Sequence, residues 1–89
     1  MPVDAISVLA EPTRRRILDE LRLAERSVGD LVGVLALSQP AVSKHLKVLR
    51  EAGFVSSRTA AQQRIYRLEP GPFRALEAWL TPYRRIWSG

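Results

Sequence analysis

Residues 38 to 54 combine side chains that contact nucleic acid with an apolar side that can be buried. Val42, Leu46 and Leu49 recur at helical spacing and so define one face of a helix. The opposite face carries the polar and basic residues Gln39, Ser43, Lys44, Lys47 and Arg50. Glutamine can make a bidentate contact to adenine, and lysine binds phosphate as a point charge. The segment therefore predicts a helix that reads DNA, against the alternative that Gln39 caps the helix and Ser43 faces water.

Both ends of this helix are specified by the sequence. Ser38 can accept a hydrogen bond from a first-turn amide, and Pro40 falls where a missing N–H costs nothing. Gly53 supplies the left-handed residue that follows a last helical turn. The position of the DNA-reading face is thus predicted together with the helix that carries it.

Several other side chains are candidate contacts to DNA. Arg58 and Arg64 flank a polar hairpin tip, where contact with phosphate or the minor groove competes with simple solvation. His45, the one histidine, is left open between a DNA contact and a partly packed position. The full candidate set is Ser38, Gln39, Pro40, Ser43, Lys44, His45, Lys47, Arg58, Gln62, Gln63, Arg64 and Arg15.

The run of arginines at residues 14 to 16 opens a predicted helix, which is the unfavourable end for cations. One of the three is expected to meet a phosphate. The others are expected to pair with Glu11, Asp19 or Glu20, and the sequence does not distinguish among them.

The positive charge is concentrated in the middle of the chain. The net charge is +5 over 89 residues, and residues 38 to 67 contain six basic residues and one acidic residue. Residues 1 to 37 contain five basic and six acidic residues, so they carry none of the excess. Because the charge coincides with the predicted DNA-reading helix, nucleic acid is favoured over a generally solvated basic surface.

Composition excludes several function classes. The chain has no cysteine, so disulfides and thiolate metal sites are absent, and it has no apolar run long enough to span a bilayer. We expect a cytoplasmic protein that does not contact membranes. No nucleophile lies beside a base and no glycine-rich phosphate loop is present, so we do not expect an enzyme. A protein-interaction module without specific DNA binding is the remaining alternative, and the charge distribution argues against it.

The elements that must position these residues follow the order α-α-α-α-β-β-α, a mainly α fold with a small β-hairpin, which is a winged helix-turn-helix. The predicted helices cover residues 6–10, 12–23, 28–34, 38–54 and a last segment from residue 73, and the predicted strands cover residues 54–59 and 64–68. Pro82 is expected to interrupt the last helix near Thr81. We expect one domain over residues 1–89, with residues 1–10 and 71–89 as dimerisation helices.

The last helix has more apolar surface than one small core can bury. Its aromatic residues could line a pocket for a small apolar ligand, but such a stripe is more often a packed interface between copies. The expected dimer contacts are Ile6, Leu9, Phe73, Leu76, Trp79, Leu80, Tyr83 and Trp87.

Three segments carry a family resemblance, namely AEPTRRRIL at residues 10–18, SQPAVSKHLKVLREAGFV at 38–55 and RIYRL at 64–68. They resemble the ArsR/SmtB family of winged-helix transcriptional repressors, and the chain is similar to its SdpR-type autorepressors, a branch without metal ligands. The resemblance implies a homodimer on an imperfect inverted repeat, with recognition helices in successive major grooves and wings along the flanking backbone or minor groove. It also implies a further helical stretch beyond Gly89.

The resemblance also bears on cofactors and effectors. Metal-sensing members of the family carry a Cys-Val-Cys type motif at the start of the third helix, where this chain has Ser27, Val28 and Gly29. A second family site uses Asp and His on the last helix, and this last helix has neither. We therefore expect no metal and no cofactor. The expected partners are double-stranded DNA and a second copy of the chain, and a small-molecule effector is left open.

Overall fold

The computed structural model describes residues 4–89, so residues 1–3 of the expected first dimerisation segment lie outside the described part. The elements in chain order are α1 (Ala5–Leu9), α2 (Pro12–Leu23), β1 (Arg26–Ser27), α3 (Val28–Leu35), α4 (Gln39–Glu51), β2 (Val55–Ala60), β3 (Gln63–Leu68), α5 (Gly71–Leu80), the 3-10 helix η1 (Thr81–Tyr83) and α6 (Arg85–Ser88). This confirms the mainly helical winged helix-turn-helix fold that the sequence predicts.

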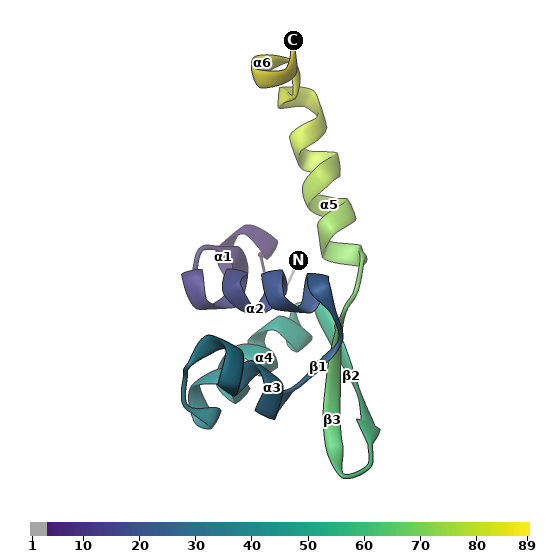
Figure 1. Ribbon diagram of the computed structural model, residues 1–89. Coiled ribbons are helices and arrows are strands. Elements are labelled where there is room, and N and C mark those ends of the chain that lie inside the picture. The colour runs from purple at the N-terminus through teal and green to yellow at the C-terminus, as the bar shows by residue number, and fades with distance from the viewer. Residues whose placement is uncertain (1–3) are drawn as a thin grey trace.

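Helices α1 to α4 form a body with the β-hairpin beside it, and α5 runs away from this body at the end opposite the hairpin tip (Figure 1). The molecule is therefore elongated, with principal extents of 47 × 23 × 22 Å. The hairpin tip and the outer end of α5 therefore lie at opposite ends of the molecule (Figure 1).

The core lies where α2, α3 and α4 meet the base of the hairpin. Ile17, Leu31 and Leu49 are fully buried, one from each helix, and Phe54 closes the core just after α4. Burial of one such side chain contributes about 2 kcal/mol to stability. This packing fixes α4 against the body and leaves its other face in solvent.

Local hydrogen bonds set the limits of α3. Ser27 and Asp30 form a reciprocal capping box, in which the Ser27 Oγ accepts from the Asp30 N–H at 3.0 Å and the Asp30 carboxylate accepts from the Ser27 N–H at 3.0 Å. These bonds hold the pKa of Asp30 below its usual range. At the other end Ala36 adopts a left-handed conformation with φ 55°. The turn into α4 is therefore short and specified at both sides.

The structure corrects the expected order of elements at β1. This strand has two residues and pairs antiparallel with β3, Arg26 opposite Tyr66 and Ser27 opposite Ile65, in a sheet of order β1-β3-β2. A two-residue strand has no periodicity of its own, so only its pairing partner reveals it. The strand links the start of α3 to the hairpin.

The hairpin tip is also tighter than expected. Ala61 and Gln62 both have positive φ, 49° and 69°, and Ala60 pairs with Gln63 directly below them. This is a two-residue connection of the kind whose twist matches the flanking strands. Gln63 therefore belongs to β3 instead of the tip. The interruption of the last helix at Thr81 is confirmed, because η1 separates α5 from α6.

Candidate nucleic-acid interface

Helix α4 presents the polar face that its sequence predicts. Val42 and Leu46 are at most 1% exposed, whereas the polar and basic residues of the opposite face are all exposed. The Ser38 Oγ accepts from the Ala41 N–H at 3.3 Å, which confirms Ser38 as the N-terminal cap. Ser38 and Pro40 are themselves exposed in the first turn. The side chains of Gln39, Ser43, Lys44, Lys47 and Arg50 are therefore available to a ligand.

A groove of about 350 Å³ runs between α4 and the hairpin. Gln39 and Ser43 line one side, one helical turn apart, and the start of α3 forms the end wall. The hairpin supplies the other side through Gln62, Gln63, Arg64 and Tyr66. Amide, hydroxyl and guanidinium groups from two elements thus face one channel, and these are the groups that bind base edges and phosphates.

Strand alternation places Arg64 and Arg58 on opposite faces of the hairpin. Arg64 pairs with Thr59 on the face that borders the groove, and its Nη1 donates to the Ser57 Oγ at 3.2 Å. Arg58 pairs with Ile65 on the other face, and its Nη2 lies 2.8 Å from the Glu25 Oε1. Arg64 therefore borders the groove, whereas Arg58 is held in an ion pair away from it.

The base of the wing is braced by a small polar cluster. The Ser56 Oγ donates to the Glu69 carboxylate, and the Arg67 Nε donates to the same carboxylate at 3.2 Å. The Ser56 hydrogen bond is the main reason why the pKa of Glu69 lies below its usual range. This cluster ties β2 to the end of β3 and so helps to fix the hairpin against the body.

The three arginines at the start of α2 donate to other helices. Arg15 donates to the Leu9 carbonyl in the last turn of α1, and the Arg16 Nη2 donates to the Leu35 carbonyl at the end of α3 at 3.3 Å. Carbonyls at a helix C-terminus lack intrahelical partners and favour cations. The expected pairing of these arginines with acids is therefore wrong for residues 4–89. Helix-end carbonyls next to α2 explain the unusual position of the run.

Arg14 and His45 contact each other. The Arg14 Nε donates to the His45 Nδ1 at 3.4 Å, and the Arg14 Nη1 donates to the Val8 carbonyl at 3.5 Å. The His45 Nε2 lies 3.8 Å from the Glu11 Oε2, and the His45 side chain is only 19% exposed. Of the two alternatives for His45, the structure supports the packed one.

The expected dimer residues are mostly exposed. Helix α5 contains no buried residue, and Trp79 is 55%, Trp87 60% and Ile6 50% exposed. The Phe73 ring meets the Phe54 ring edge-on with centroids 5.3 Å apart, which anchors the first turn of α5 to the core. Leu9 and Leu76 are half-buried against that core.

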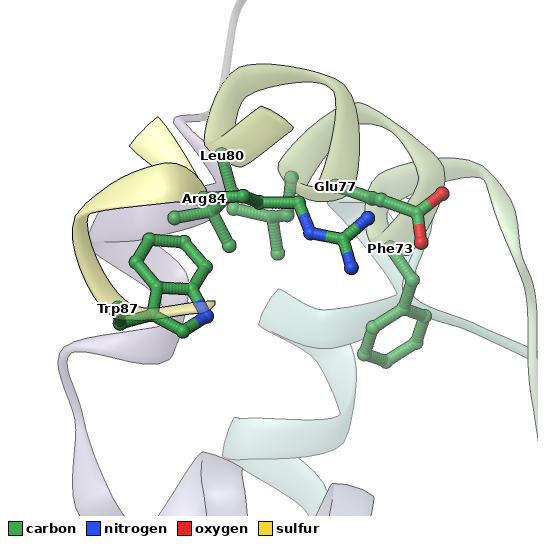
Figure 2. Close-up of a pocket in the computed structure, with 6 residues that line it drawn as sticks. Phe73, Glu77, Leu80, Arg84 and Trp87 are labelled. Carbon is green, nitrogen blue, oxygen red and sulfur yellow. The ribbon is translucent and has the colours of Figure 1, made fainter. Parts of the chain in front are cut away.

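A shallow hollow of about 340 Å³ lies along α5 and α6. Figure 2 shows the Trp87 indole at one end and the Phe73 ring at the other, with the Arg84 side chain between them and the Glu77 side chain at the Phe73 end. Leu76 and Leu80 complete its apolar floor. Trp79 and Tyr83 lie outside the lining of this hollow, and their rings pack together with centroids 5.1 Å apart. Trp79 lines a second hollow with Ile6 and Leu76.

Within residues 4–89, no three His, Cys, Asp or Glu side chains are grouped so that they could hold a metal ion. None of the helices in that range has the length and apolarity needed to cross a membrane.

Sequence reasoning missed Glu25 and Ser57. Glu25 neutralises Arg58 and Ser57 orients Arg64. Ser57 is identified by the register of the hairpin, whereas Glu25 lies outside the hairpin and meets Arg58 only through the tertiary fold.

Comparison with known proteins gives consistent matches. The model of the arsR family of bacterial regulatory proteins matches residues 11–57. The chain is 41% identical over 87 residues to the HTH-type transcriptional regulator Rv2034 of Mycobacterium tuberculosis, covering 98% of this chain and 78% of that protein. It is 32% identical over 65 residues to the transcriptional repressor SdpR of Bacillus subtilis, covering 73% and 72%.

Solved structures give the same result. The crystal structure of the ArsR family transcriptional regulator RHA00566 superimposes with a TM-score of 0.80 and 29% sequence identity, covering 96% of this chain and 88% of that one. The likeness therefore extends beyond the helix-turn-helix to nearly the whole chain.

Proposed function

The chain belongs to the ArsR family of bacterial regulatory proteins and is a DNA-binding transcriptional repressor, and we propose that it binds an inverted-repeat operator as a homodimer. In this proposal α4 is the recognition helix and lies in the major groove. The hairpin is the wing and follows the flanking backbone or minor groove. In this proposal the protein acts in the cytoplasm, where a bacterial operator would lie. The observation that carries the proposal is the polar groove in which α4 and the wing present their side chains together.

We assign base reading to Gln39 and Ser43. They lie one turn apart near the N-terminus of α4, which is the part of a recognition helix that reaches base edges. Gln39 is suited to a bidentate contact with adenine and Ser43 to a base or a phosphate. Gln62 at the exposed tip extends the contact from the wing.

We assign phosphate binding to Lys44, Lys47 and Arg64. The residues that the structure describes give neither lysine an ion-pair partner, and Arg64 is held only by a serine hydroxyl. Each ammonium or guanidinium can therefore neutralise one phosphate and release its counterion. Arg58 remains a candidate contact outside this set, because its guanidinium lies 2.8 Å from the Glu25 carboxylate in an exposed ion pair.

We assign the exposed apolar face of α5, together with Ile6 of α1, to a second copy of the chain. Trp79 of α5 and Trp87 of α6 are more than half exposed, on the segment that extends from the body. Exposed aromatic patches of this kind mark protein interfaces. A two-fold dimer would present two recognition helices to half-sites about 34 Å apart, which is one turn of DNA. The hollow in Figure 2 is then filled by the partner copy.

Selection of bound DNA from a random pool tests this proposal. We expect the recovered sequences to share an inverted repeat with its half-sites about one helical turn apart. Gln39→Ala should weaken binding to this operator more than binding to random DNA, whereas Lys44→Ala should weaken both. A pool without any shared sequence would contradict specific binding, and equal losses on both DNAs for Gln39→Ala would exclude its base-reading role.

A further inference from the structure

We infer that Arg14 and His45 form a positioning pair that fixes the rotation of the recognition helix α4 about its own axis. The inference rests on the proposed role of α4 in reading DNA. Neither residue is assigned a contact with DNA. The pair acts by holding Gln39 and Ser43 in register with the base edges.

The imidazole of His45 is contacted at both of its nitrogens. Nδ1 accepts from the Arg14 Nε at 3.4 Å, and Nε2 lies 3.8 Å from the Glu11 Oε2. A neutral imidazole has one donor and one acceptor nitrogen, so this arrangement requires the proton on Nε2, where it faces the carboxylate. The hydrogen bond from Arg14 orients the ring, and the Glu11 carboxylate lies beyond hydrogen-bond distance on its other side. Because the ring belongs to α4, the helix is restrained with it.

The groups that hold the ring are themselves fixed. The Glu11 carboxylate caps α2 by accepting from the Arg14 N–H at 3.1 Å, and the Arg14 Nη1 donates to the Val8 carbonyl of α1 at 3.5 Å. Val8 is 2% exposed and belongs to the core. One arginine therefore joins α1, α2 and the recognition helix. Since α1 also carries Ile6, part of the proposed dimer surface, the pair connects that surface to α4.

Rotation matters because base contacts are short. A side chain 5 to 6 Å from a helix axis moves about 1 Å when the helix turns by 10°. A hydrogen bond to a base edge weakens strongly over that distance, whereas a lysine can follow a phosphate with its flexible stem. Loss of the pair should therefore reduce specific affinity more than non-specific affinity.

The experiment is a double-mutant cycle on DNA binding. Arg14→Met removes the donors but keeps most of the chain length, and His45→Leu removes the acceptor but keeps an apolar group of similar size. His45→Asn is the rescue variant, because its side-chain oxygen can replace Nδ1 as an acceptor. Arg22→Met is the matched control, since it removes the same charge from an exposed position of α2. Dissociation constants are measured for the selected operator and for random DNA, and thermal unfolding is recorded for every variant.

We expect each single variant to lose about tenfold in operator affinity and less than twofold on random DNA. The double variant should be no weaker than either single variant, and His45→Asn should recover most of the loss. Arg22→Met should change both affinities by the same factor. If His45→Leu does not fold, Arg14→Met and His45→Asn still give the ratio of operator to random affinity, which a purely structural role would leave unchanged.

Two results would overturn the inference. If the affinity loss of the double variant equals the product of the two single-variant losses, Arg14 and His45 act separately. If Arg14→Met loses affinity for operator and random DNA by the same factor, Arg14 makes a direct phosphate contact. Wild-type protein that binds operator and random DNA equally would instead overturn the proposed function, and the inference with it. Wild-type discrimination combined with uncoupled variants would overturn the positioning pair alone.

Discussion

Replacement of Lys44 by glutamine should lower the salt dependence of operator binding by a defined amount. The Lys44 ammonium is exposed on the recognition helix and has no ion-pair partner among the described residues. Each phosphate contact contributes about 0.9 to the slope of log K against log salt on duplex DNA. A dimer loses two such contacts, so the slope should fall by about 1.8. Lys47→Gln should lower the slope by the same amount, and the slope of the double variant should fall by about 3.6.

The same reasoning gives the change in affinity. At 0.1 M salt a slope difference of 1.8 corresponds to about sixtyfold weaker binding, and the difference should vanish on extrapolation to 1 M. Fluorescence anisotropy with a labelled operator between 0.1 and 0.4 M salt measures both quantities. Arg58→Gln serves as the comparison, because its cation is already neutralised by Glu25 at 2.8 Å.

Two outcomes would refute this reasoning. A Lys44→Gln affinity loss that stays constant with salt would mean that Lys44 does not displace counterions. A slope change for Arg58→Gln as large as that for Lys44→Gln would mean that pairing in the free protein does not identify which cations bind phosphate.

Three further results are expected. Trp79→Ala should raise the dimer dissociation constant at least tenfold in sedimentation equilibrium, and an unchanged value would remove α5 from the interface. The depressed pKa of Asp30 stabilises the fold above about pH 4, and this contribution is lost as the pH falls through the folded-state pKa. Asp30→Asn should therefore weaken the fall in unfolding free energy at acid pH, measured by urea titration at several pH values. A fall as steep as that of wild type would contradict this. Gly53→Ala should lower the free energy of unfolding by about 1 kcal/mol, because the φ of Gly53 is 82°. Gly33→Ala within α3 should raise it by about 0.5 to 1 kcal/mol. Equal effects of the two variants in thermal unfolding would rule out backbone strain as the cause.

Features that depend on neighbouring residues could be predicted from the sequence. The Ser38 cap and the interruption at Thr81 each involve residues within a few positions of one another. The apolar face of α4 follows from periodicity alone. These local signals were sufficient to predict the helix-turn-helix and the exposed polar face.

Features that depend on tertiary pairing could not be predicted. The ion pair of Arg58 with Glu25 and the contact of Arg14 with His45 join residues 33 and 31 positions apart. The charge pattern of a sequence gives the number of cationic side chains but does not show which of them already pair with an acidic or polar group. For the same reason β1 was missed, since its two residues become a strand only beside β3. The sequence thus predicts the surface that faces DNA better than the contacts that orient it.

If α5 forms the proposed dimer interface, its absence of buried side chains makes gene control sensitive to protein copy number. A ten-residue helix is marginal in water on its own, and in the proposed dimer burial against a second copy would stabilise its outer turns. Dimer formation then follows mass action, and below the dissociation constant the amount of dimer rises with the square of the monomer concentration. A twofold rise in expression would give about a fourfold rise in operator-competent protein. A repressor built in this way switches its promoter over a narrower range of protein concentration than a monomer could.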